Sequence, residues 1–493
     1  MSTLHTSINF DQTIPQIYLV QSLENISKAP LLQTLKFEGK YEQITILPES
    51  KEIFVGTKYE TGSDTIDPFA VADYYALGSK ITKTLKGTSF ESANINCPAP
   101  IKAKQLEHLL LGLLQGAVDF DKYIKTKTSK DFDFYLEDRL LEVLDSHKIS
   151  YINAINTAVT LTRKVVEDTP QAINPSTMPK IIQEQFEGNN NVSIKTLSYE
   201  QMIEMGMEGI TAVGRASANK PVLVHTTIKP KGETKKKIVL IGKGLCYDSG
   251  GYDIKTGGFM KGMKDDMAGS GTMFGVTKAI ADLGLNGVEL HWISAFAENM
   301  IDGTAYKADD ILTSYSGQTI EIFNTDAEGR LTLADALTYA TLLEPDYIVD
   351  AATLTGACIM AVTKNFTALM SNSKELKDKL ISKFEEENEP TVYTPMPEIH
   401  RKVVVGEISD LMNTSHLERQ AGHITAGLFL SHFVDQKLFR NENLKIQNPK
   451  CYKWVHLDIA GSASNNKQNS LGVNGATGQS VRSLVSWVLD EDK

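Results

Sequence analysis

KKIVLIGKGLCYDSGG, residues 236–251, joins an apolar run of strand length to a polar turn that is rich in glycine. Such a short apolar run is typical of a strand buried inside a parallel sheet. Three similar runs follow it, and helical patterns lie between them. The runs are VELHWISAFA (288–297), DYIVDAATLTG (346–356) and KWVHLDIAG (453–461), and the helical patterns are GTMFGVTKAIADLGL (271–285) and RLTLADALTYATLLE (330–344). The alternation predicts a doubly wound α/β domain, which binds ligands at the carboxyl edge of its sheet.

The residues before this domain predict a smaller domain, also of the α/β class. Strand-like runs at 41–48 and 51–57 precede helical patterns at 69–85 and 102–118, and no catalytic cluster stands among them. Since a domain takes roughly 100 to 200 residues, a chain of 493 residues is expected to hold at least two domains.

The boundary between the domains is expected where NAINTAVTLTRKVVEDTPQAINPSTMP, residues 153–179, changes from helical spacing to a stretch with prolines. Proline stops a helix and biases the residue before it to an extended conformation. The predicted parts are an N-terminal α/β domain at 1–155, a linker helix and turn at 156–175, and a larger catalytic domain at 176–493.

The composition is that of a soluble globular protein, with 41% hydrophobic and 23% charged residues. No apolar run reaches the roughly 18 to 20 residues that span a bilayer, and the polar start MSTLHTSINF lacks the layout of a secretory signal. We therefore expect a cytoplasmic protein without a membrane partner. The net charge of -11 repels phosphate backbones, so nucleic acid is not an expected partner. The four cysteines form no CxxC pair, and we expect them to be buried as small apolar residues.

Three polar clusters stand where the predicted strands end and loops or helices begin. They are GKGLCYDSGG (242–251) with Lys243 and Asp248, KGMKDDMAGSG (261–271) with Asp265 and Asp266, and NTDAEGRL (324–331) with Asp326, Glu328 and Arg330. Residues two apart in an extended segment point the same way, so we expect the last three side chains to project into one pocket. The first cluster is not a phosphate-binding loop, because the GxxxxGK[ST] spacing is absent.

Each cluster by itself has a simpler structural interpretation as a helix cap or a surface ion pair. Their co-occurrence favours a functional site, because carboxylates gathered in one buried place cannot all stay ionised without cations. None of the ten histidines falls inside the clusters, and HExxH is absent, so the donors are mainly oxygen atoms. We predict a dinuclear hydrolase, whose two ions would polarise a substrate carbonyl and lower the pKa of a bridging water.

These motifs, together with Lys255, resemble the signature of the leucyl aminopeptidase (cytosol aminopeptidase) family of dinuclear-metal exopeptidases. The resemblance covers most of 150–493 and continues through ATLTGA (352–357), AGHITAGLFLSHFV (421–434) and WVHLDIAG (454–461), whereas the N-terminal domain matches only in size and style. The departures are mild: Tyr247 stands where phenylalanine is common, and AGSG (268–271) replaces a more usual glycine-alanine run. They bear on the shape of the pocket and leave the implied activity intact.

Carried over residue by residue, the resemblance implies five metal ligands, with Asp248 and Glu328 as the bridging pair. The ligands are Lys243, Asp248, Asp266, Asp326 and Glu328. Lys243 would coordinate as a neutral amine, since adjacent dications displace its proton. The implied catalytic residues are Lys255, which would stabilise the transition state, and Arg330, which would hold a bicarbonate ion as general base. The expected ions are manganese or zinc, with cobalt or magnesium as alternatives.

The reaction that the resemblance implies is removal of the N-terminal residue, preferably leucine-like, from peptides with a free N-terminus. Met263 falls on the pocket position, with Thr353, Gly356 and Ala460 as weaker candidates, and core packing is an equal alternative for Met263. Family members are usually hexamers, so a homohexamer is expected.

Two other classes of function remain open at this point. Oxygen ligands alone do not choose between amide and phosphoryl substrates, so a two-metal phosphatase or another dinuclear hydrolase competes, although Lys243 and Lys255 beside NTDAEGRL favour the peptidase. A dipeptidase, such as a cysteinylglycine hydrolase, would use the same chemistry. The other class is a DNA-binding or scaffolding protein that kept the fold, a second role of some bacterial relatives, against which the acidic first 170 residues argue.

Overall fold

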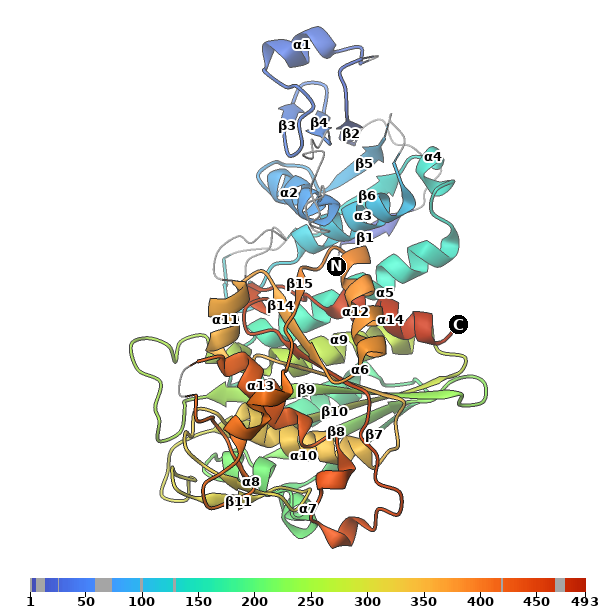
Figure 1. Cartoon of the computed structure of the whole chain (residues 1–493). Coiled ribbons are helices and arrows are strands. Elements are labelled where there is room, and N and C mark those ends of the chain that lie inside the picture. Colours follow the sequence, from blue (N-terminus) through green and yellow to red (C-terminus); the bar gives the residue numbers. More distant parts are fainter. Residues whose placement is uncertain are drawn as a thin grey trace. The chain divides into compact units, whose positions relative to one another are not determined.

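The computed structural model describes residues 2–5, 14–24, 26–57, 73–97, 101–126, 130–417, 420–465 and 475–493. The chain forms two compact units, which part between Thr160 and Leu161, within α5 (Ser146–Glu167) (Figure 1). The limits 1–155, 156–175 and 176–493 stay a prediction. Among the described residues, no helix combines the length and the apolar character needed to cross a membrane.

The first unit is built on a six-stranded sheet in the order β1-β6-β5-β2-β4-β3. Its strands are β1 (Thr3–His5), β2 (Gln16–Val20), β3 (Ile44–Leu47), β4 (Glu52–Gly56), β5 (Ser92–Asn96) and β6 (Asp133–Leu136), and its other helices are α1 (Ala29–Thr34), α2 (Tyr74–Lys86), α3 (Ala103–Ala117) and α4 (Asp138–Leu141). Among the described strands of this sheet, only β3 and β4 pair in the antiparallel sense. The predicted strands at 41–48 and 51–57 and the helix at 102–118 are confirmed, and residues 69–72 of the other predicted helix lie outside the described residues.

Glycine lets α2 and α3 pack at very short range. A Cβ atom on Gly112 would lie 2.0 Å from the carbonyl oxygen of Tyr75, and one on Gly78 would lie 2.2 Å from that of Leu109. Any side chain at either glycine would therefore push the two helices apart.

The second unit contains an eight-stranded sheet in the order β15-β14-β17-β13-β9-β10-β8-β7. The strands are β7 (Val192–Leu197), β8 (Val222–Ile228), β9 (Lys236–Asp248), β10 (Val288–Asn299), β13 (Tyr347–Ala352), β14 (Thr367–Ser371), β15 (Thr391–Tyr393) and β17 (Trp454–Asp458). The central four, β17, β13, β9 and β10, are parallel to one another and correspond to the four apolar runs of the sequence. The predicted α/β fold is thus confirmed. Antiparallel pairings of β8 with β10 and of β14 with β17 make the sheet mixed.

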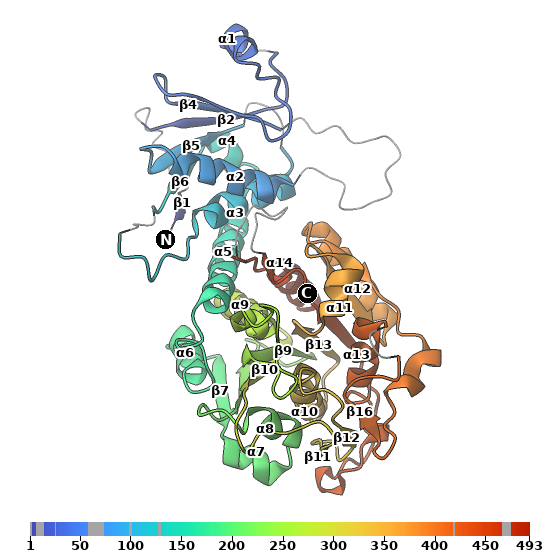
Figure 2. The same ribbon diagram turned by 90° about the vertical axis from the view of Figure 1, so that its left-hand side faces the viewer.

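Helices cover both faces of this sheet (Figures 1 and 2). One face carries α9 (Ala268–Leu283), α12 (Lys374–Glu386) and α14 (Val481–Glu491), and the other carries α8 (Glu208–Gly214), α10 (Gly329–Thr341) and α13 (Gly422–Ser431). Val239 and Ile241 of β9 enter the hydrophobic core that also contains α10, while Phe274 of α9 stacks on Trp292 with ring centroids 5.1 Å apart. The alternation of side chains along each strand supplies both cores.

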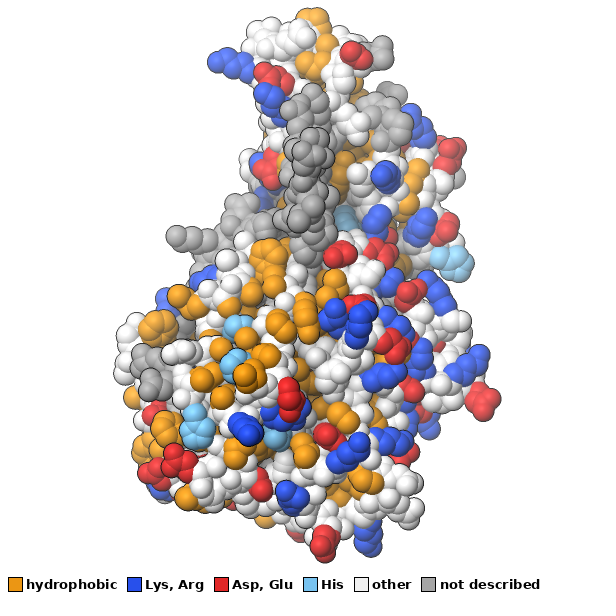
Figure 3. Space-filling model, in the orientation of Figure 1, with side chains coloured by type: hydrophobic (Ala, Val, Ile, Leu, Met, Phe, Trp, Pro, Cys, Tyr) orange, Lys and Arg blue, Asp and Glu red, His pale blue; other side chains and the backbone are white. Residues whose placement is uncertain are grey.

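Shorter elements complete the second unit. They are α6 (Met178–Gln185), α7 (Tyr199–Met205), η1 (Met263–Met267), β11 (Ile311–Thr313), β12 (Thr319–Glu321), α11 (Gly356–Val362), η2 (Glu398–Val404), β16 (Leu411–Met412), η3 (Gln436–Leu438), η4 (Glu442–Leu444), β18 (Ser464–Asn465) and β19 (Gly475–Ala476). Three cysteines are buried as expected, but Cys451 is exposed, because it lies in a loop before β17 rather than within the sheet. Figure 3 shows acidic and basic side chains interspersed over one face of the protein.

Candidate metal centre

A β-bulge brings Lys243 and Asp248 to the same face of the sheet. Both residues belong to β9, and in a regular strand a spacing of five would turn their side chains to opposite faces. The ladder between β9 and β10 shifts by one residue between Ala297 and Glu298, which leaves Cys246 as the extra residue of β9. The bulge reverses the alternation once, so that Asp248 points the same way as Lys243.

The Lys243 ammonium group lies among three buried carboxylates, those of Asp248, Asp266 and Glu328, which form the buried cluster. Its Nζ atom is 2.7 Å from Oδ1 of Asp266 and 3.0 Å from Oε1 of Glu328, and only 3% of the side chain is exposed. It also donates a hydrogen bond of 3.0 Å to the carbonyl oxygen of Thr353. Burial by itself lowers the pKa of Lys243, but the charges of Asp266, Glu328 and Asp248 outweigh it and raise the pKa above its ordinary value.

Lys255, in the loop that follows β9, pairs with the carboxylates of Asp248 and Asp326. Its Nζ atom is 2.7 Å from Oδ2 of Asp248 and also contacts Oδ1 of Asp326. Burial lowers the pKa of Lys255, whereas Asp248 and other carboxylates raise it, and the net effect is a raised pKa. Lys255 is therefore a stable cation at neutral pH, next to a carboxylate that also faces the cluster.

The segment from Asp326 to Arg330 is not extended, which corrects the argument that these side chains alternate into one pocket. Ala327 donates a backbone hydrogen bond of 3.2 Å to Asn324, which closes a turn, and α10 begins at Gly329. In a turn and a helix the side chains rotate around the axis instead of alternating. Accordingly Asp326 contacts Lys255, while Glu328 contacts Lys243.

The capping interpretations of these residues do not hold. Glu328 is the N-cap residue of α10, but its side chain makes no capping hydrogen bond, and the N-cap residue of α9 is Met267 rather than an aspartate. The carboxylate groups of Asp266 and Glu328 point to the cluster instead, where each meets Lys243.

The carboxylates of this cluster fit divalent cations. Asp248, Asp266 and Glu328 are all buried, and each offers an oxygen atom within 4.8 Å of the others. Among the described residues, Oδ2 of Asp266 and Oε2 of Glu328 are buried without a hydrogen-bond partner. Burial raises the pKa of both carboxyl groups, and the charges of neighbouring carboxylates raise it further. Lys243 offsets these two effects only in part. Unpaired buried oxygen atoms are the donors that hard divalent ions take.

Two glycines make the close approach possible. A Cβ atom on Gly329 would lie 2.4 Å from Cε of Lys243, so the lysine chain passes directly over the start of α10. Gly250 has a φ of 88°, in the left-handed region that other residues disfavour, and a Cβ atom there would lie 3.0 Å from Oδ1 of Asp326.

Sequence reasoning missed a buried aspartate that contacts one predicted pocket residue, Ala460, and two neighbours of others. Asp458, the last residue of β17, is fully buried and accepts hydrogen bonds from the Leu354 and Ala460 backbones, both at 3.2 Å, and from Thr355 Oγ1 at 2.8 Å. It thereby ties together the loops after β13 and β17. The sequence signal that could have found Asp458 is its position, as an acidic residue at the end of an apolar run, where ligands bind at the carboxyl edge of such a sheet.

The four predicted pocket positions lie in different elements around the cluster. Thr353 touches it, because its hydroxyl donates to Oδ1 of Asp266 at 2.7 Å. Met263 is the half-buried first residue of η1, the element that carries Asp266, and the exposed Gly356 begins α11. Ala460 contacts Asp458, as described above.

Arg330 is buried beside the cluster on the first turn of α10, with 8% of its surface exposed. Burial lowers the pKa of its guanidinium to about 10, against the opposing effects of Glu328 and Asp458, so it stays charged at neutral pH. Its Nε atom has no hydrogen-bond partner among the described residues. A buried guanidinium with an unused donor fits a small planar anion.

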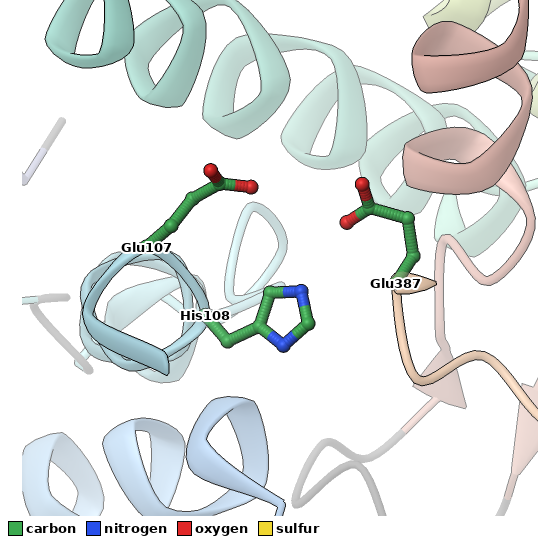
Figure 4. Close-up of side chains that lie close together, drawn as sticks. All are labelled: Glu107, His108 and Glu387. Carbon is green, nitrogen blue, oxygen red and sulfur yellow. The ribbon is translucent and has the colours of Figure 1, made fainter. Parts of the chain in front are cut away.

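Glu107 and His108 are acidic and imidazole side chains of the first unit, adjacent on α3 and both buried. Figure 4 shows them projecting from that helix. Glu107 is paired with Lys104, whose Nζ atom is 2.6 Å from its Oε1. Glu387, drawn in the same view, belongs to the second unit, and two neighbours on one helix do not make a metal site.

Comparison with known proteins identifies the relatives of the chain. Residues 160–485 match the family described as "Cytosol aminopeptidase family, catalytic domain". A probable cytosol aminopeptidase of Helicobacter hepaticus is 35% identical over 480 residues, which cover 96% of this chain and 96% of the relative. That of Wolinella succinogenes is 35% identical over 476 residues, covering 95% and 93%. The crystal structure of the cytosol aminopeptidase from Coxiella burnetii is similar, with a TM-score of 0.81, 26% identity, and coverage of 100% of this chain and 99% of that one.

Proposed function

Because the chain belongs to the cytosol aminopeptidase family, we propose that it is a two-metal exopeptidase that releases the N-terminal residue of peptides. The family resemblance read from the motifs is confirmed, and the protein is an aminopeptidase, hence a hydrolase of peptides. A phosphatase assignment finds no support among these relatives. We propose in addition the two-metal mechanism and the roles of the individual residues.

Five residues would hold the two divalent ions: Lys243, Asp248, Asp266, Asp326 and Glu328. The observation that carries this proposal is the buried cluster of Asp248, Asp266 and Glu328, whose oxygen atoms lie within 4.8 Å of one another. When bound, the two ions would supply Lewis acidity and a water of lowered pKa. Manganese or zinc suits such donors, with cobalt or magnesium as alternatives.

The two lysines would have different roles in this site. Lys243 contacts two of the proposed ligands and would lose its proton to join them. Lys255 lies at the edge of the cluster, with 14% of its side chain exposed, and would remain charged. There it would donate a hydrogen bond to the substrate carbonyl oxygen as negative charge develops in the transition state.

Arg330 would hold a bicarbonate ion. Its burial, its positive charge and its Nε atom, which has no hydrogen-bond partner in the described part of the chain, support this assignment. Bound bicarbonate would supply the general base of the reaction. The guanidinium would orient this ion and keep it in the dry interior by a charge-assisted contact.

The substrates would be peptides with an unblocked N-terminus and a leucine-like first residue. Met263, Thr353, Gly356 and Ala460 would line the slot for that side chain. The contact of Thr353 with Asp266 supports a slot next to the metal centre. We further propose that the protein works in the cytoplasm as a homohexamer and does not bind nucleic acid.

The experiment that tests this function is removal of the metal ions. After prolonged chelation, verified by elemental analysis, release of leucine from an unblocked leucyl peptide should cease, and manganese, cobalt or zinc should restore it. Circular dichroism of the metal-free protein should show that the fold survives. Full activity after verified metal removal would exclude the two-metal mechanism.

A further inference from the structure

Asn299 connects two loops that carry proposed metal ligands. It is the last residue of β10, it is fully buried, and it pairs in the sheet with Asp248, the last residue of β9. Its Nδ2 group donates to Oδ1 of Asp248 at 2.8 Å and to the carbonyl oxygen of Thr325 at 3.0 Å. Thr325 directly precedes Asp326, so one amide group reaches both ligand loops.

The chemistry of the amide fixes its orientation. Both groups that meet Nδ2 are acceptors, so a rotated amide would place oxygen against oxygen at both contacts. The Oδ1 atom of Asn299 is buried and has no hydrogen-bond partner among the described residues. The two donated hydrogen bonds are therefore what this side chain contributes, and an unpaired buried oxygen is tolerated to keep them.

The bond to Asp248 leaves the second oxygen of that carboxylate for the cluster. Oδ1 of Asp248 accepts from Asn299 and, at 2.9 Å, from the Gly250 backbone, whereas Oδ2 faces Lys255. Without these donors only the contact with Lys255, at Oδ2, would hold the carboxylate. The amide thus selects which oxygen of Asp248 is presented to a cation.

The other ligand loop is held at several points around the same carbonyl group. Thr325 O also accepts from Tyr306 at 2.7 Å, and Thr325 Oγ1 donates to the Gly250 carbonyl at 2.7 Å. The backbone of Asn299 joins this arrangement, since its carbonyl oxygen accepts from Ser249 Oγ at 2.7 Å. Asn299 touches a proposed ligand and the other loop through a single group, its Nδ2 amide.

We propose that Asn299 is a positioning residue of the metal centre, which holds Asp248 and the Asp326 loop in the geometry that binds two ions. The inference rests on the proposed two-metal function. Hydrogen-bond partners of metal-binding carboxylates orient them, and their loss lowers metal affinity by roughly 10 to 100-fold. Asn299 touches no reacting group, so its effect on catalysis runs through the metal.

The test compares two substitutions of similar shape. Asn299→Leu removes both N–H donors and keeps the branch at Cγ, while Asn299→Asp replaces the donating Nδ2 nitrogen by an oxygen atom that repels Asp248. Asn174→Leu is the matched control, because Asn174 is also buried and its amide donates to backbone carbonyls at 3.1 and 3.4 Å, within residues 170–177. Manganese affinity is measured by competition with a chromophoric chelator, and kcat and KM with a leucyl peptide at saturating manganese.

Both Asn299 variants should bind manganese roughly 10 to 100-fold more weakly than the wild type. At saturating manganese, kcat should recover towards the wild-type value with KM unchanged, and Asn174→Leu should lose thermal stability without losing affinity. Wild-type affinity in folded Asn299 variants would overturn the inference while leaving the two-metal function intact. Unfolding of both metal-free variants would also overturn it, since the amide would then serve the fold. A wild type that binds none of manganese, zinc, cobalt and magnesium would overturn the proposed function itself, and this inference with it.

Discussion

Replacing each of the two site lysines by methionine should produce different failures. Methionine keeps much of the length and apolar stem of lysine but has no charge. Lys255→Met should retain both metal ions and lose turnover, because Lys255 would act on the transition state. Lys243→Met should lose metal occupancy, because Lys243 would be a ligand and stands between Asp266 and Glu328.

The contacts set the expected magnitudes. Loss of one buried donor to a developing oxyanion typically lowers kcat by about 100-fold or more, or roughly 3 kcal/mol, which is the expectation for Lys255→Met. Lys243 is 3% exposed and pairs at 2.7 and 3.0 Å with two buried carboxylates. Breaking a buried ion pair from one side costs about 3–5 kcal/mol, so metal-free Lys243→Met should unfold at a lower temperature. Protonation of the two carboxyl groups, whose pKa values burial raises, limits this loss.

The assay combines elemental analysis of the purified variants with kcat measured over a manganese titration. The activity of Lys243→Met should recover in part at high manganese, since the four carboxylates remain and mass action restores occupancy. The kcat of Lys255→Met should stay low at every concentration. Lys278→Met serves as the control, because this lysine of α9 pairs with Asp282 one turn away and should change neither quantity.

The reverse pattern would refute these roles. If Lys255→Met lost its ions while Lys243→Met kept its ions and full activity, the assignment of ligand and transition-state donor would be wrong. Equal metal loss in both variants would show instead that the two lysines act only by balancing the charge of the carboxylates.

N-acetylated leucyl peptides should be inert, because acylation removes the basic amine that would bind metal; their rapid cleavage, measured beside the free peptides, would indicate another class of hydrolase. Met263→Ala should lower kcat/KM for leucyl substrates by roughly 10-fold, the value of a lost apolar contact, and much less for alanyl substrates, and an equal loss for both would return Met263 to core packing. Burial and the neighbouring His291 lower the pKa of His225 from 6.5 to about 4. The unfolded chain therefore binds a proton at this residue more readily than the folded protein, and stability falls as the pH drops from 6.5 towards 4. The wild type should therefore lose up to about 3 kcal/mol more than His225→Gln between pH 7 and pH 4 in urea unfolding, and identical losses would contradict this.

The sequence by itself determined the central strands and the family. The four apolar runs predicted β9, β10, β13 and β17, because burial on both faces of a parallel strand requires nearly continuous apolar residues. The motif NTDAEGRL and the two lysine-containing clusters were sufficient to identify the family, since they combine rare spacings with charged residues at strand ends. These features involve residues that are close together in the chain, so they can be recognised without knowledge of the fold.

Only the tertiary structure decided how those residues meet. The bulge at Cys246 turns Asp248 to the side of Lys243, and the turn before α10 sends Asp326 and Glu328 to different lysines. Asn299 binds the Thr325 carbonyl, 26 residues away in the chain, and Asp458 binds the Leu354 backbone, 104 residues away. Such contacts depend on strand register and on the packing of helices against the sheet. A shift of one residue in the register between two strands would change all of these contacts. That register cannot be read from the spacing of residues within a single motif.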